Sequence, residues 1–187
     1  MLILASQSPR RRELLSLITE DFEVIPAKGE ERADRSLPPD KYVCELARHK
    51  AEEVAAAHPG AVVIGADTVV SAGGQILGKP ADADDAQRML RLLSGTEHSV
   101  FTGVCVISAG GQQVFCCETR VRFDELDDRE IADYIASGEP FDKAGAYGIQ
   151  GRGALLVGSI SGDYYNVMGL PVNMLYRRLK KICPELM

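Results

Sequence analysis

The 187-residue sequence lacks the features that mark several large classes of protein. It has no excess of positive charge: 27 Asp and Glu outnumber 21 Lys and Arg, and the net charge of -6 argues against a general nucleic-acid coat. No apolar run is long enough to span a bilayer, and no basic segment precedes the apolar residues 2–5 as a secretory leader requires. We therefore expect a cytoplasmic protein with no membrane contact and no stable nucleic-acid binding.

The sequence also lacks the cysteine and histidine patterns that build metal sites. Its five cysteines are odd in number and include no C-x-x-C pair, which fits reduced thiols in a cytosol and gives no zinc motif. We interpret all five as structural residues that pack as small hydrophobes. The three histidines are scattered, with no spacing typical of metal ligands or of a catalytic triad.

An alternation of strand and helix patterns runs through the chain. Strands are predicted at residues 2–5, 22–25, 61–70, 100–107, 113–123 and 154–160, and helices at residues 10–18, 40–57, 82–93, 127–137 and 171–182. Hairpins at residues 72–74 and 109–111 interrupt the alternation, which favours an α/β fold with a mixed β-sheet flanked by helices. Because no repeat, low-complexity tract or linker divides the chain, we expect a single domain over residues 1–187.

Residues 6–12 place three arginines in the first turn of a predicted helix, directly after a strand. Ser8 suits the N-cap and Pro9 suits the first helical position. Cations at this end oppose the helix dipole at a cost of about a few tenths of a kcal/mol each, so a sequence built only for stability would carry Asp or Glu there. Two interpretations follow: phosphate binds among backbone N–H groups, the two serine hydroxyls and the arginine side chains of this turn, or the arginines simply extend into water.

Asp67 lies within the most apolar predicted strand, residues 61–70. Asp is disfavoured inside strands, and a buried charge is costly unless it is paired or bound to metal. Asp67 is therefore either a metal ligand or general base, or a carboxylate satisfied by neighbouring backbone N–H groups. Glu30 and Glu31, in a polar loop, are either a further metal-binding carboxylate or a solvated charge pair.

Two lysines and a glycine-rich segment complete the candidate residues. Lys50 falls on the apolar stripe of its predicted helix, so it either reaches the rim or points at a bound anion. Lys79, on a stiff Gly-Lys-Pro turn, is either a surface lysine or a further cation for that anion. Residues 142–151 either approach a ligand through their backbone or form a flexible connection. The amide of Gln150 can both donate and accept, as the edge of a base requires.

Taken together, these segments resemble the Maf family of nucleoside triphosphate pyrophosphatases. The matching pieces follow one another through the whole chain at residues 4–11, 47–51, 65–70, 78–80, 142–151 and 169–171. The resemblance implies two lobes around a deep cleft, as in the inosine triphosphate pyrophosphatases. It also implies hydrolysis between the α- and β-phosphates, supported by a divalent cation such as Mg²⁺ or Mn²⁺.

The resemblance also assigns roles to single residues. Asp67 falls where the family has its proton acceptor; whether it also holds the metal, with Glu30 as a second ligand, stays open. The positions that set substrate choice in the family correspond to Arg10, Thr68 and Gln150. The polar positions that line the family's pocket, which we interpret as phosphate-binding, correspond to Ser6, Arg11, Lys50 and Lys79.

The Gly-Ile-Gln-Gly run at residues 148–151 resembles the branch of the family that acts on dTTP and UTP. We therefore expect these nucleotides, or modified pyrimidine relatives, as substrates. Two alternatives stay open: a 7-methyl-GTP pyrophosphatase of the same fold, and a nucleotide-binding regulator of cell division without turnover. The sequence departs from the family pattern at Gln7 and at residues 28–29, next to Glu30. A homodimer is compatible with the resemblance.

Overall fold

The structure is a computed structural model that describes residues 1–29 and 33–184. Its strands are β1 (Leu2–Ala5), β2 (Glu23–Val24), β3 (Val62–Ala72), β4 (Gln75–Leu77), β5 (Glu97–Ser108), β6 (Gly111–Phe123) and β7 (Val157–Ser161). Its helices are α1 (Pro9–Ser16), α2 (Pro39–Ala57), α3 (Ala83–Leu93), α4 (Asp128–Ala136), α5 (Tyr164–Met168) and α6 (Val172–Ile182), with 3-10 turns η1 (Glu139–Asp142), η2 (Ala144–Ala146) and η3 (Gly151–Leu155). None of the helices in these described residues is both long and apolar enough to cross a membrane.

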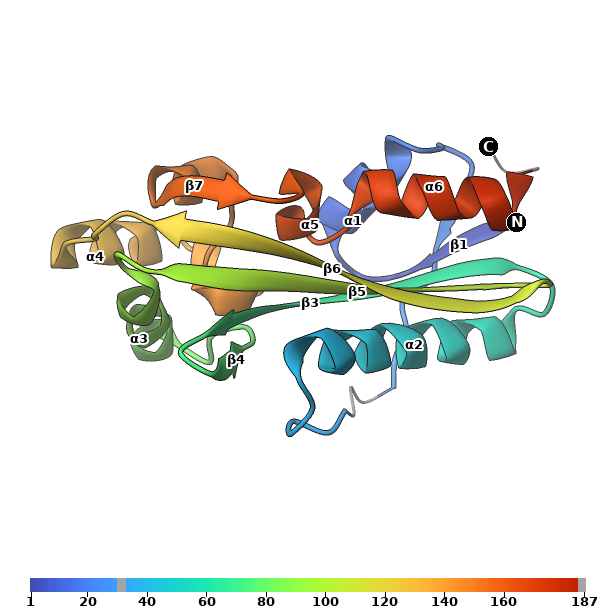
Figure 1. Cartoon of the computed structure of the whole chain (residues 1–187), viewed down its shortest axis with the longest axis horizontal. Coiled ribbons are helices and arrows are strands. Elements are labelled where there is room, and N and C mark those ends of the chain that lie inside the picture. The colour runs from blue at the N-terminus through green and yellow to red at the C-terminus, as the bar shows by residue number, and fades with distance from the viewer. Residues whose placement is uncertain (30–32, 185–187) are drawn as a thin grey trace. The chain divides into compact units, whose positions relative to one another are not determined.

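The strands form one mixed sheet in the order β2-β1-β3-β5-β6-β7, with β4 paired to β3 (Figure 1). β1 runs parallel to both of its neighbours, whereas β4 is antiparallel to β3 and β7 is antiparallel to β6. The expected α/β fold, a mixed sheet flanked by helices, is confirmed.

The chain folds into two compact units. The first contains Met1–Asp67, Thr102–Cys117 and the segment that begins at Gly169; the second contains Thr68–Phe101 and Glu118–Met168. β3 passes from the first unit to the second between Asp67 and Thr68, so two adjacent candidate residues belong to different units. The expected deep cleft and the single domain over residues 1–187 stay predictions.

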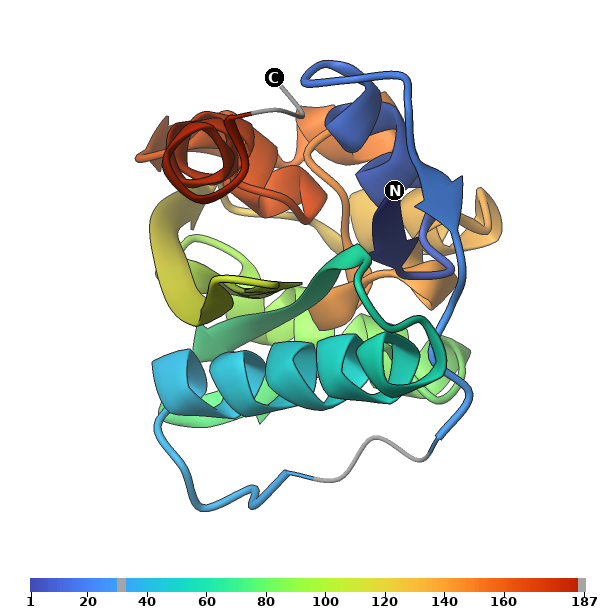
Figure 2. The same ribbon diagram turned by 90° about the vertical axis from the view of Figure 1, so that its right-hand side faces the viewer.

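In the first unit, α2 covers one face of the sheet, and α1 and α6 cover the other (Figures 1 and 2). Ala47, Ala51 and Val54 of α2 pack against buried side chains of β1, β3 and β5. Two strand glycines bring this helix very close. A Cβ at Gly65 would lie 2.3 Å from the carbonyl oxygen of Ala47, and a Cβ at Gly103 would lie 2.4 Å from the carbonyl carbon of Val43. The backbone of α2 therefore rests directly on β3 and β5.

The second unit has its own apolar core, built around Phe123, Leu90, Ile131 and Tyr147. Two helices of this core begin at acidic N-caps. The carboxylate of Asp82 accepts the Asp85 N–H at 2.8 Å at the start of α3. At the start of α4, Asp127 and Glu130 form a capping box, in which each side chain accepts the backbone N–H of the other. The acidic residues at the start of α4 thus cap the helix.

One prediction about the last third of the chain is wrong in detail. The strand expected from residue 154 begins only at Val157, because residues 151–155 form the turn η3. The segment before it is regular in part, since it contains the 3-10 turns η1, η2 and η3. The sequence analysis does not predict the short helix α5, because a helix of this length shows no periodicity. It begins where the Asp163 carboxylate accepts the Tyr165 and Asn166 N–H groups at 2.8 and 3.2 Å.

Candidate active site

The first group of polar residues lies where β1 ends beside its parallel neighbour β3, which continues past that point to Ala72. Ala5 of β1 pairs with Gly65 of β3, so Ser6 is the first residue beyond β1 and Asp67 lies two residues beyond the same pair. Both are buried, with exposed fractions of 6% and 8%. The carboxyl ends of parallel strands are a common position for ligand sites in open α/β sheets.

Asp67 is paired with Lys50 of α2. Oδ1 of the carboxylate accepts a hydrogen bond from the lysine Nζ at 2.6 Å, and the two side chains are only 12% and 16% exposed. Lys50 therefore points at the strand rather than at the rim, which excludes the interpretation of a surface lysine. The close backbone approach of α2 at Gly65 explains how this helix reaches Asp67. A buried carboxylate and ammonium stabilise each other's charge, so Asp67 does not depend on neighbouring backbone N–H groups alone.

Arg11 folds back onto the protein at the end of β1. Its Nε donates to the carbonyl oxygen of Gly169 at 2.9 Å, and one terminal nitrogen donates to Ser6 Oγ at 3.4 Å. Ser6 Oγ also accepts the Ser8 N–H at 3.2 Å, and Ser8 is the N-cap of α1 as predicted. Arg11 therefore does not simply extend into water. Sequence reasoning gave no role to Gly169, because a carbonyl acceptor 158 residues away leaves no local signal.

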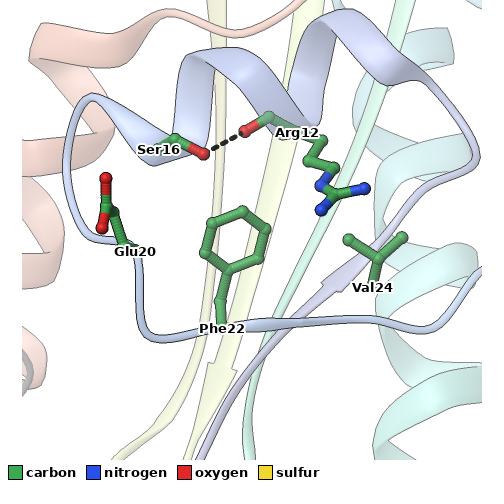
Figure 3. Close-up of a pocket in the computed structure, with 5 residues that line it drawn as sticks. All are labelled: Arg12, Ser16, Glu20, Phe22 and Val24. Atoms are coloured by element: carbon green, nitrogen blue, oxygen red, sulfur yellow. Dashed lines mark hydrogen bonds between the residues drawn. The ribbon is translucent and has the colours of Figure 1, made fainter.

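The other two arginines of this turn differ from each other in burial. Arg10 is half-buried, whereas Arg12 is exposed. Arg12 lines a surface hollow of about 380 Å³ together with Ser16, Glu20, Phe22 and Val24 (Figure 3). This hollow lies between α1 and the edge strand β2, and its lining contains none of the predicted site residues.

The remaining candidates belong to the second unit. Thr68 is half-buried on β3, and Lys79 and Gln150 are exposed. The turn that carries Lys79 is joined to the glycine-rich segment, since the Gly145 N–H donates to the carbonyl oxygen of Gly78 at 2.9 Å. The structure thus brings together Ser6 with Arg11 and Lys50 with Asp67 in one unit, while these three candidates occupy the other.

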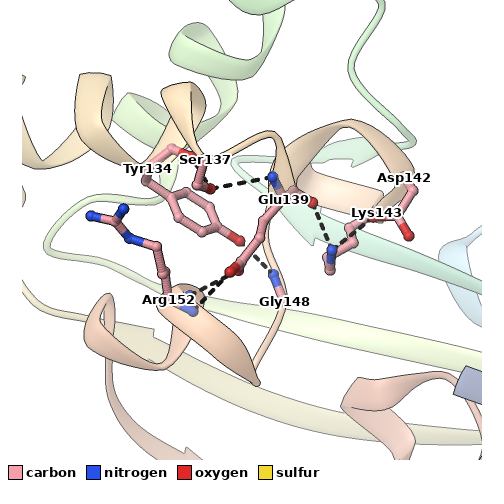
Figure 4. A network of polar contacts seen from close by, with 8 residues as sticks. Tyr134, Ser137, Glu139, Asp142, Lys143, Gly148 and Arg152 are labelled. Atoms are coloured by element: carbon pink, nitrogen blue, oxygen red, sulfur yellow. Dashed lines mark hydrogen bonds and ion pairs between the residues drawn. The ribbon is translucent and has the colours of Figure 1, made fainter.

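The glycine-rich segment at residues 142–151 is held by hydrogen bonds rather than being a flexible connection (Figure 4). The Gly148 N–H donates to the hydroxyl of Tyr134 at 3.1 Å. Lys143 Nζ donates to the backbone oxygen of Glu139 at 2.6 Å. These contacts give the backbone on the amino side of Gln150 a defined course.

A metal site would draw on carboxylates. Among residues 1–29 and 33–184, no three His, Cys, Asp or Glu side chains are grouped so that they could hold a metal ion. Mg²⁺ commonly needs only one or two carboxylates, because substrate phosphate oxygens supply further ligands, and the hard oxygens of Asp67 fit that role. Glu30, the second ligand expected, lies outside the described residues. The segment before it is anchored, since the Lys28 and Gly29 N–H groups donate to Glu53 at 2.7 and 3.0 Å.

Comparison with solved structures defines the class of fold. The chain is similar to the Ham1 protein of Staphylococcus aureus, with a TM-score of 0.59 and 16% identity over 97% of this chain and 98% of that one. It is also similar to a HAM1 protein of Coxiella burnetii, with a TM-score of 0.52 and 15% identity over 96% and 98%. At such identities the likeness concerns the fold alone, and it agrees with the expected fold class.

Comparison of sequences defines the family. The family model described as Maf-like protein matches residues 1–182, and the chain belongs to the Maf family. Three similar proteins are each named dTTP/UTP pyrophosphatase. That of Thermococcus gammatolerans is 53% identical over 177 residues, or 95% of this chain and 94% of the relative. Those of a Geobacillus species and of Bacillus velezensis are 50% and 51% identical, over 97% and 96% of this chain and 97% and 95% of each relative.

Proposed function

We propose that this chain hydrolyses dTTP and UTP to the nucleoside monophosphate and pyrophosphate. The observation that carries the proposal is the part-buried pair of Lys50 and Asp67, whose Nζ and Oδ1 lie 2.6 Å apart, and which holds a carboxylate beside the carboxyl end of β1. Further support comes from relatives about half identical over nearly the whole chain, whose names state this activity.

In the proposed reaction, Asp67 takes a proton from the attacking water, whose oxygen adds to phosphorus as the α–β anhydride bond breaks. Lys50 orients the carboxylate through a hydrogen bond to Oδ1, and we propose that Asp67, held in this way, acts as the base. Lys50, Arg11 and Lys79 are suited to hold the phosphate oxygens, where positioned cations stabilise the charge of the transition state. A divalent cation, Mg²⁺ or Mn²⁺, held by Asp67 and the phosphates would neutralise part of that charge.

Base recognition is assigned to a different group of residues. We propose that Gln150 reads the uracil or thymine edge through its amide, with Arg10 and Thr68 completing the choice of substrate. Gln150 is exposed on a held segment, which is a suitable place for a group that meets a ligand. All five cysteines are thiols, which supports a reducing cytoplasm as the location. A homodimer is proposed as the assembly, which the molar mass in solution would test.

The decisive experiment measures pyrophosphate release from UTP, dTTP, CTP and 7-methyl-GTP with added Mg²⁺ or Mn²⁺. We expect turnover of UTP and dTTP that disappears when the metal is chelated. Preferred turnover of 7-methyl-GTP would instead support the other pyrophosphatase. Tight nucleotide binding without release of pyrophosphate would support a regulator, and would contradict the proposal.

A further inference from the structure

A carboxylate holds the backbone directly after Gln150. The two oxygens of Glu139 accept the N–H groups of Arg152 and Gly153 at 3.1 and 3.4 Å. The residue between Gln150 and these two donors is Gly151, with a φ of 62°. A Cβ at Gly151 would lie only 2.8 Å from Glu139 Oε1, so the carboxylate rests against bare backbone.

The Glu139 carboxylate accepts hydrogen bonds from backbone N–H groups that have no acceptor within their own turn. The first N–H groups of a helical turn have no partner inside the turn, and η3 begins at Gly151. An ionised acceptor forms stronger hydrogen bonds with backbone N–H groups than a neutral one does. Glu139 is itself fixed, because its own N–H donates to Ser137 Oγ at 3.3 Å and its carbonyl oxygen accepts from Lys143 at 2.6 Å (Figure 4). The start of η3 is therefore hydrogen-bonded to Glu139, whose own backbone is held by Ser137 and Lys143.

We propose that Glu139 is a positioning residue that sets where Gln150 presents its amide, and so controls discrimination between uracil or thymine and cytosine. The inference rests on the proposed role of Gln150. Because that side chain is exposed, its location follows from the backbone on either side. Tyr134 fixes this backbone two residues before Gln150, and Glu139 fixes it two and three residues after.

The test compares kcat/KM for UTP and CTP in Glu139→Gln. Gln keeps the size of the side chain, but its amino group would face one of the two N–H donors, which leaves that donor unpaired. We expect the UTP-to-CTP ratio to fall about tenfold, which is roughly the discrimination that one hydrogen bond between Gln150 and the base edge would supply. Tyr134→Phe removes the acceptor on the other side of Gln150 and should lower the same ratio.

The matched control is Asp133→Asn. Asp133 is a carboxylate of the same region, but it pairs with Arg129 at 3.8 Å on the exposed face of α4. Its replacement should leave the ratio at the wild-type value. Equal losses for UTP and CTP in Glu139→Gln, with an unchanged ratio, would make Glu139 merely structural and would overturn the proposal.

Two further measurements separate failure of this inference from failure of the proposed function. If Gln150→Ala leaves the UTP-to-CTP ratio unchanged, Gln150 does not read the base and the proposed recognition is wrong. Amide hydrogen exchange at residues 148–153 reports on Glu139 independently of activity. Faster exchange in Glu139→Gln than in Asp133→Asn would support its hold on the segment, whereas identical exchange would overturn it.

Discussion

His98 Nε2 lies 2.7 Å from the hydroxyl oxygen of Tyr147, and both side chains are buried. Phe123 packs edge-on against both rings, with centroids 5.1 and 4.7 Å away. Burial lowers the pKa of His98 to about 4, because the charged ring would lose its water. His98 Nδ1 has no hydrogen-bond partner among the described residues. A neutral histidine therefore anchors the tyrosine that precedes Gly148 in the glycine-rich segment.

The first prediction is acid sensitivity that arises at His98. Its pKa is about 4 when folded and about 6.5 when unfolded, so the unfolded chain binds more protons between these values. The contribution to stability is complete above pH 6.5 and is lost as the pH falls towards 4; the shift corresponds to about 3 kcal/mol of unfolding free energy. In His98→Gln, which cannot titrate, denaturant unfolding should show a smaller decrease across this range.

The control for this prediction is His58→Gln, at the half-exposed C-cap of α2. It should keep the wild-type dependence of stability on pH. If His98→Gln and the wild type lose equal free energy between pH 6.5 and pH 4, the acid sensitivity comes from other groups.

The second prediction concerns Asp67→Asn. The replacement is nearly isosteric and still offers an oxygen to Lys50, so the circular dichroism spectrum should be retained. Loss of the proton acceptor should lower kcat for UTP by about 100- to 10,000-fold, the usual contribution of general base catalysis. Asp84→Asn, at an exposed position in the first turn of α3, is the matched control. Turnover within a few-fold of the wild type would remove Asp67 from the mechanism.

The third prediction compares two neighbouring arginines. Arg10→Ala and Arg12→Ala each remove one positive charge from the amino end of α1, where cations oppose the helix dipole. Neither should lower the melting temperature, but only Arg10→Ala should lower kcat/KM for UTP, because Arg12 lines the separate hollow beside β2. Lower stability of Arg10→Ala with normal kinetics would indicate that Arg10 is a structural residue.

The fourth prediction concerns the selectivity of the wild type and of Gln150→Glu. Uracil and thymine alternate carbonyl oxygen and ring N–H along the edge that an amide can read, whereas cytosine places an amino group opposite the amide donor. The unpaired donors cost about 1–3 kcal/mol, so UTP should be preferred over CTP by about ten- to hundredfold. Gln150→Glu should weaken this preference more than it slows UTP hydrolysis. Equal kcat/KM for CTP and UTP in the wild type would refute the idea.

The sequence predicted the polar residues of the first unit better than it predicted their contacts. The sequence identifies Asp67 as a candidate because it is a charged residue in an apolar strand. It identifies Lys50 because it is a cation on the apolar stripe of a helix. Their pairing could not be derived, because it depends on how α2 lies over β3. The sequence does not predict that Gly169 binds Arg11 or that Glu139 binds the start of η3. In both cases the partners are far apart in the chain, and hydrophobic periodicity gives no information about such contacts.

The starts of helices were predicted well, because capping depends on residues that are neighbours in the sequence. Ser8 and Pro9 fixed the start of α1, and the acidic caps fixed the starts of α3 and α4. The end of the glycine-rich segment was misjudged because η3 depends on the distant carboxylate of Glu139 and not on its own composition.

Gly65 and Gly103 carry a constraint that a search for reactive groups would miss. Neither has a side chain to offer a nucleotide, yet any methyl group there would collide with the backbone of α2. Lifting that helix would draw Lys50 away from Asp67, so two inert positions act as spacers for a reactive pair. A mutant library that varies only charged and polar residues would leave these spacers unsampled, and variation at them should be as poorly tolerated as variation at the carboxylate itself.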